Sequence, residues 1–133
     1  MARDRGDGEH GDERLLGRLR QLSLIDLDSL LAGSSGEGRA DLLAAHADDV
    51  IDALGLARQR MAELTRDVVA GPDPLAILDA APAVRMRGAA GEGPGRLAAR
   101  LASRAEACRD LARMEEAAAL LLPRLFEIER QRG

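Results

Sequence analysis

Residues 39–70 have the sequence RADLLAAHADDVIDALGLARQRMAELTRDVVA. Apolar residues recur in this stretch at alternating steps of four and three, which places their side chains along one face of an α-helix. We call this line of side chains the seam. It consists of Leu43, Ala47, Val50, Leu54, Ala57, Met61, Leu64 and Val68. The pattern predicts one long amphipathic helix over 39–70, ended by Gly71 and Pro72 because glycine followed by proline is a strong stop signal.

The rest of the chain indicates an all-α fold. A chain of 133 residues with one Phe, no Tyr and no Trp is long enough for one domain but is poor in the residues that favour strands. Apolar periodicity predicts further helices over 12–32 and 94–132, and a short one over 74–81. We expect an elongated bundle of three main helices, because rods of this length exceed the diameter of a globule of this size.

Several boundaries follow from local signals. Residues 1–11 are charged and rich in Gly, so we expect a disordered tail, followed by a helix that begins near Asp12 and a single domain over 12–132. A slip in apolar spacing predicts a kink near Ser23, which would cap a second short helix with Asp26 at its third position. Pro123 predicts a kink in the last helix. Residues 82–93 hold several Gly and predict a mobile loop.

Composition argues against several classes of function. The net charge is −4 and aromatic residues are nearly absent, which disfavours nucleic acid as a partner. Cys108 is the single cysteine, and His10 and His46 are far apart, so no metal site is expected; His46 lies beside the seam and is expected at its rim. The longest apolar run, 117–122, is too short to cross a membrane. No cofactor is expected, and the predicted location is cytoplasmic.

A helix-turn-helix over 47–66 is the alternative to a continuous long helix. Val50, Leu54, Gly55, Met61 and Leu64 fit the apolar and glycine spacing that such a motif resembles. Ile51 stands where a small residue normally lets the two helices approach, and Ala57 is a poor helix cap. Since the seam also runs without interruption through Gly55, the continuous helix is favoured.

The segment 82–113 concentrates positive charge, with seven arginines against three carboxylates, a balance of +4. Arg96, Arg100 and Arg104 are spaced four apart and form a stripe on one helix face. The stripe is either a solvated face answered by the acidic half of the long helix, or a site for an anionic partner. The glycine-rich stretch 88–95 lacks the Lys and Ser/Thr of a phosphate-binding loop. The predicted partner-binding residues are Arg85, Arg87, Arg96, Arg100 and Arg104.

The long helix also predicts self-association. Acidic residues occupy its first half and Arg58, Arg60 and Arg66 its second half, so two copies paired antiparallel would match opposite charges. Leu43, Val50, Leu54, Met61 and Leu64 would form the seam of this homodimer.

No pair of side chains has the spacing of a nucleophile with its base or of two convergent carboxylates. We therefore expect no enzymatic activity. The sequence favours a protein–protein interaction module, an adaptor, chaperone-like protein or regulatory scaffold, that binds an acidic protein surface or helix, a second copy of itself, or both. The alternative function is a DNA-binding regulator that uses residues 47–66.

Overall fold

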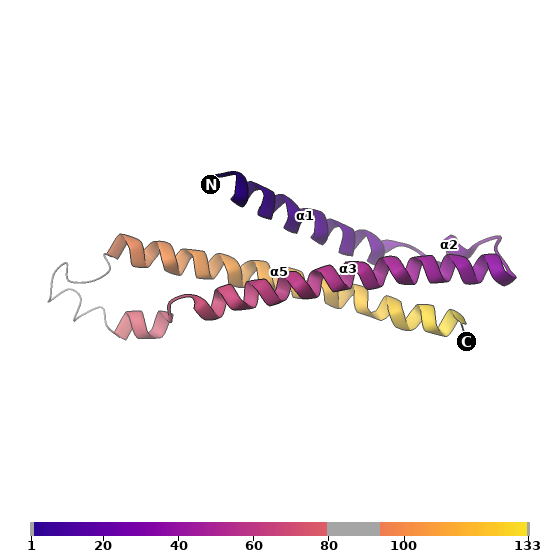
Figure 1. The fold of residues 1–133 in the computed structure, drawn as a ribbon. Coiled ribbons are helices and arrows are strands. Elements are labelled where there is room, and N and C mark those ends of the chain that lie inside the picture. Colours follow the sequence, from indigo (N-terminus) through magenta and orange to yellow (C-terminus); the bar gives the residue numbers. More distant parts are fainter. Residues whose placement is uncertain (1, 80–93, 133) are drawn as a thin grey trace. The chain divides into compact units, whose positions relative to one another are not determined.

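The computed structural model describes residues 2–79 and 94–132 of the chain. Its elements are α1 (Ala2–Leu24), α2 (Leu27–Leu31), α3 (Gly36–Ala70) and α5 (Pro94–Arg132) (Figure 1), and residues 74–79 are also helical. The described residues contain no strand. The predicted all-α bundle is therefore confirmed. Residues 80–93, which include the predicted loop and the last two residues of the predicted short helix, lie outside the described part.

The packing divides the chain into two compact units. The first unit comprises Met1–Arg60 with Arg113–Gly133, and the second comprises Met61–Ala112. We describe each unit by itself, and the prediction of a single domain over 12–132 stays a prediction.

The link between α1 and α2 corrects the predicted cap. The helix does break after Leu24, as the apolar pattern indicated, but the cap of α2 is Asp26 and not Ser23. The Asp26 carboxylate accepts hydrogen bonds from the Asp28 N–H at 3.2 Å and from the Ser29 hydroxyl at 2.7 Å. The Ser23 hydroxyl instead donates to the carbonyl of Arg20 at 2.7 Å. Asp26 rather than Ser23 is the cap because α2 begins three residues later than predicted, and the Asp26 carboxylate accepts from a free backbone N–H in its first turn.

The start of α1 also differs from the prediction. Helical backbone begins at Ala2 rather than near Asp12. Once a helix has formed over its apolar part, each further residue needs only one more hydrogen bond, so polar residues can extend it toward the N-terminus. Helical backbone thus covers residues 2–11, and their disorder in solution stays a prediction.

Two glycines shape the turn between α2 and α3. Gly33 and Gly36 have φ angles of +77° and +57°, a left-handed conformation that side chains with a Cβ rarely adopt. Gly33 follows the end of α2 as a C-terminal glycine commonly does. The chain reverses there and enters α3 three residues before the predicted start.

The long helix α3 is continuous through Gly55. The segment 47–66 therefore contains no turn, and the helix-turn-helix interpretation of it is wrong. A Cβ built on Gly55 meets nothing within 4 Å, so this glycine leaves a local weakness in the helix without providing space for a neighbour. The end of α3 at Ala70, directly before Gly71, agrees with the stop signal.

The core of the first unit forms where α1, α2 and the end of α5 cover the seam. The Arg39 side chain donates a hydrogen bond to Gln131, and Ile128 packs with Leu43 and Ala47, so α5 runs antiparallel to α3 (Figure 1). The fully buried side chains of this unit are, among the described residues, Leu16 and Leu19 of α1, Val50, Ala53 and Ala57 of α3, and Met114, Leu121 and Ile128 of α5. Burying each large aliphatic side chain contributes about 1.5–3 kcal/mol, so these contacts hold the three helices together.

Helix α5 continues without interruption through Pro123, whose ring faces solvent. Proline removes one backbone hydrogen bond from a helix. Buried residues lie on both sides of the proline, with Leu121 before it and Arg124 and Ile128 after it. Packing of these residues against the other helices therefore maintains α5 across the missing hydrogen bond.

In the second unit, Asp73 begins the short helix as predicted. Its carboxylate accepts a hydrogen bond from the Leu75 N–H at 3.0 Å, and residues 74–79 are helical. The core of this unit includes Leu64 and Ala107. All eight residues of the seam are buried or half-buried in their respective units.

The continuity of α3 leads to a prediction at Gly55. We expect Gly55→Ala to stabilise the protein by about 0.5–1 kcal/mol, because Ala reduces the entropy of the unfolded chain and no atom obstructs its methyl group. Urea denaturation followed by circular dichroism measures this change. Gly33→Ala is the control and should destabilise, since its φ is positive. A loss of stability in Gly55→Ala would contradict a continuous helix.

Candidate functional site

Two polar side chains are buried in the first unit, and sequence analysis predicted neither. His46 is 5 % exposed and Arg124 is 9 % exposed. His46 was expected at the rim of the seam, and this expectation is wrong. Because α3 packs against both α1 and α5, its buried arc is wider than a two-helix seam and includes His46 and Ala53. Only the neighbours of α3 decide the width of that arc.

Each of these two side chains has one nitrogen without a hydrogen-bond partner among the described residues, namely His46 Nε2 and Arg124 Nη1. Arg124 Nη2 donates to the Ser23 carbonyl at 3.0 Å, and Nη1 lies 3.8 Å from a carboxylate oxygen of Glu127. Burial lowers the pKa of His46, the nearby Arg124 guanidinium lowers it further, and Asp49 acts in the opposite direction. His46 is therefore neutral at pH 7. The hydrogen bond from Arg124 to Ser23 connects the end of α1 to α5.

An open cleft of about 510 Å³ lies beside Arg124. Residues 25–28 of the α1–α2 link and Arg124, Glu127, Arg130 and Gln131 of α5 line it. Its two arginines face three carboxylates, and several of its polar groups already have structural roles, such as Asp26 in capping α2 and Arg124 in binding Ser23. The cleft offers no surplus of one charge and no convergent pair for catalysis.

The most distinctive surface of the first unit is formed by exposed apolar side chains on α3 and α5. Helix α1 covers one flank of this helix pair. Four contacts place α1 there: Arg18–Asp49 at 4.0 Å, Asp12–Arg60 at 2.7 Å, Glu13–Arg113 at 2.7 Å, and the Arg124–Ser23 hydrogen bond.

The opposite flank of the pair has no helix on it within the described residues. Each helical residue advances about 100°, so Ile51 projects on the side of α3 opposite Asp49 and Arg60. By the same count, Leu122 and Phe126 project on the side of α5 opposite Arg113 and Arg124. Ile51 is 55 % exposed, Leu122 48 % and Phe126 67 %. We call the surface formed by Ile51, Leu122 and Phe126 the open face.

The antiparallel register brings these three residues together. The Arg39–Gln131 hydrogen bond and the packing of Ile128 with Leu43 and Ala47 set this register. In it, Ile51 lies level with residues near 120 of α5. The open face is therefore one apolar area that extends over two helices, and Phe126 is the single aromatic residue of the chain. Apolar areas of this kind commonly mark interaction sites.

The predicted arginine stripe is partly structural. The Nε atom of Arg104 donates to the Val68 carbonyl at 3.3 Å. A Cβ on Gly71 would lie 3.1 Å from the Arg104 Cγ and Cδ atoms, so the missing side chain at Gly71 leaves room for the arginine stem. A cation here satisfies the negative end of α3. For Arg104, this contact is with the C-terminus of α3 and not with the acidic half of that helix.

The other stripe residues give a mixed result. Arg96 and Arg100 are exposed on α5, and each makes a further interaction. Arg85 and Arg87, with most of the glycine-rich stretch 88–95, lie outside the described residues. Binding of an acidic partner by these arginines stays a prediction.

The predicted homodimer seam is already used within the chain. Leu43, Val50 and Leu64 are at most 2 % exposed, and Leu54 and Met61 are half-buried. A dimer paired through these residues would require the chain's own helices to leave α3. Within one chain the neighbouring helices already cover most of the seam, and its use in a homodimer stays a prediction.

The remaining candidate groups carry no site. The described residues include no group of three or more His, Cys, Asp or Glu side chains placed to hold a metal ion. Cys108 is half-buried on α5. Among the described helices, none combines the length and the apolar character needed to span a bilayer.

The fold and the open face define a helical bundle protein with an exposed apolar surface. Comparison with protein-family models, with curated proteins and with solved structures finds no match to this chain. The argument on function therefore rests on the chain's own residues.

The contact of Arg104 with α3 leads to a prediction on local stability. We expect Arg104→Ala to speed hydrogen exchange at the amides of residues 68–71 by roughly two- to tenfold, equivalent to about 0.5–1.5 kcal/mol. The reason is that the substitution removes the donor to Val68. Arg109→Ala, an exposed arginine on the same helix, is the control. Unchanged exchange would mean that Arg104 does not cap α3.

The lowered pKa of His46 leads to a prediction on pH. Above pH 6.5 the histidine is neutral in both folded and unfolded chains, so its burial carries no proton penalty. Below pH 6.5 the unfolded chain binds a proton that the folded chain resists. We therefore expect the wild type to lose stability, relative to His46→Gln, as the pH falls below 6.5. Denaturant unfolding of both proteins between pH 8 and pH 5 measures this difference, and parallel profiles would contradict it.

Proposed function

We propose that this protein is a non-catalytic interaction module that binds a partner protein through the open face. The exposure of Ile51, Leu122 and Phe126 on one flank of α3 and α5 is the observation that carries the proposal. An exposed aromatic residue among aliphatic neighbours is a common anchor of protein interfaces. Adaptor, chaperone-like and scaffolding roles all fit such a surface.

The arrangement of the first unit supports this proposal. Helix α1 packs on one flank of the α3–α5 pair and its side chains Leu16 and Leu19 are almost fully covered, although Leu56 and Leu120 on that flank stay exposed. A partner helix on the open face would complete a four-helix arrangement, in which both flanks of the pair are covered. The single cysteine, which fits a reducing compartment, supports the cytoplasm as the proposed location.

Tagged protein incubated with an extract of the native host tests the proposal. We expect the wild type to retain a specific protein and the double variant Leu122→Asp/Phe126→Asp to lose most of it, because two carboxylates would have to be buried on binding. Both positions are exposed, so the variant should keep the wild-type circular dichroism spectrum.

Leu120→Asp is the matched control for this experiment. Leu120 lies on the same helix and is 59 % exposed, but it projects on the flank that faces α1. It should therefore retain the partner at the wild-type level. Equal retention by wild type, control and double variant would show that the open face does not carry the interaction.

A further inference from the structure

We infer that the partner segment for the open face is a basic amphipathic helix. This inference rests on the proposed function and adds the chemistry of the occupant. It follows from the shape of the α3–α5 pair, from the charges around the open face, and from the mismatch that a second copy of this chain would create.

The shape of the site favours a helix. Two antiparallel helices leave a groove along each flank, and α1 already occupies one of these grooves as a helix. On the other flank, Leu122 and Phe126 are separated by one turn of α5, and Ile51 of α3 lies level with them. Side chains spaced at i, i+3, i+4 and i+7 on a partner helix can fill such a groove.

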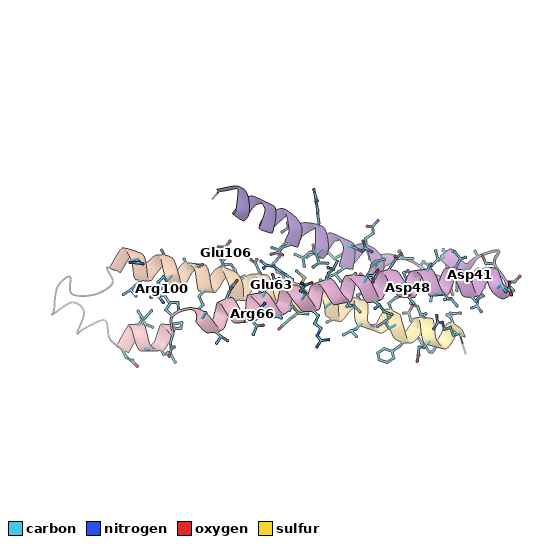
Figure 2. All side chains as sticks on the ribbon, in the orientation of Figure 1. Asp41, Asp48, Glu63, Arg66, Arg100 and Glu106 are labelled. Carbon is cyan, nitrogen blue, oxygen red and sulfur yellow. The ribbon has the colours of Figure 1, made fainter. Side chains whose placement is uncertain are left out.

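The charges around the open face are mostly negative. We consider the half of each helix centred on the open face, between residues 41 and 58 of α3 and between residues 115 and 130 of α5. The carboxylates there are Asp41, Asp48, Glu115 and Glu129, against the arginines Arg58 and Arg130. All six side chains are exposed (Asp41 and Asp48 are labelled in Figure 2).

None of these four carboxylates forms an ion pair within the described part of the chain. By contrast, Asp12 and Glu13 of α1 pair with arginines of α3 and α5, and Asp49 of α3 pairs with an arginine of α1. Carboxylates on the α1 side of the helix pair are therefore paired with arginines, and those on the open side are not. A helix with Arg or Lys beside its apolar stripe would supply the missing partners and would be guided to the face by their charge.

A second copy of this chain is a poorer occupant. Two copies related by a two-fold axis would place the same patch against itself. The carboxylates of one rim would then lie near those of the other, and like charges opposed across an interface disfavour binding. A basic helix avoids this repulsion, so charge complementarity selects it.

Two synthetic helical peptides of about 18 residues test the inference. Both carry the same stripe of Leu and Ala, and the residues beside the stripe are Arg in one and Glu in the other. We expect the wild-type protein to bind the basic peptide at least about tenfold more tightly at 50 mM salt, measured by fluorescence anisotropy. At 300 mM salt this preference should shrink, because ions screen exposed charges.

Three variants locate the binding. Phe126→Ala should weaken binding of the basic peptide by about tenfold or more, as loss of a central aromatic anchor does. Asp41→Asn/Asp48→Asn should weaken binding of the basic peptide and strengthen binding of the acidic one, because it removes negative charge beside the open face. Leu120→Ala, on the opposite flank, should bind both peptides as the wild type does. Circular dichroism confirms that each variant is folded.

The possible outcomes separate this inference from the proposed function. Equal affinity for the two peptides, or no binding of either by folded wild type, overturns the basic-helix inference, and the capture experiment with Leu122→Asp/Phe126→Asp still decides whether the open face binds a protein. Sedimentation equilibrium of the wild type alone tests the second copy. A dimer that Phe126→Ala abolishes would assign the face to self-association and would also overturn the inference.

Discussion

The burial of the seam on α3 is the constraint on which the first unit depends. Val50, Ala53 and Ala57 are fully buried, and so are Leu16 and Leu19 of α1 and Leu121 of α5. A chain with a single aromatic residue and many alanines has few large side chains with which to offset the entropy of ordering. Helices in proteins owe most of their stability to such packing, because short isolated helices are only marginally stable in water.

Packing on two sides also explains the buried polar groups. A helix between two neighbours buries a wide arc, so it takes in His46, which lies beside the line of large apolar residues. The Arg124 side chain is buried beneath the end of α1, where it donates a hydrogen bond to the Ser23 carbonyl. A polar atom left without a partner in the interior weakens a fold by about 1–3 kcal/mol. His46 and Arg124 each have one such nitrogen, and these are local weaknesses within a core that is otherwise aliphatic.

The distribution of charge gives the two flanks of the α3–α5 pair different properties. On the α1 side, arginines and carboxylates from different helices meet in pairs, such as Arg60 with Asp12 and Arg113 with Glu13. The Arg60–Asp12 pair is half-buried, and the exposed Arg113–Glu13 pair contributes little to stability, but both match α1 to its flank. On the open side, apolar side chains and unpaired carboxylates remain at the surface. The difference supports a partner that brings both apolar and positively charged groups.

The sequence by itself determined the helices, because apolar periodicity, the glycine and proline stop after α3, and the Asp73 cap are local signals that act within a few residues. The continuity of α3 through Gly55 was predictable for the same reason. The tertiary structure decided which side of each helix is covered. Whether Leu64 or Phe126 is buried depends on residues far along the chain, and so does the covering of the seam by other helices of the same molecule. Burial of His46, the contact of Arg104 with Val68, and the open face all arise from contacts between residues far apart in the sequence, and no spacing within one helix encodes those contacts.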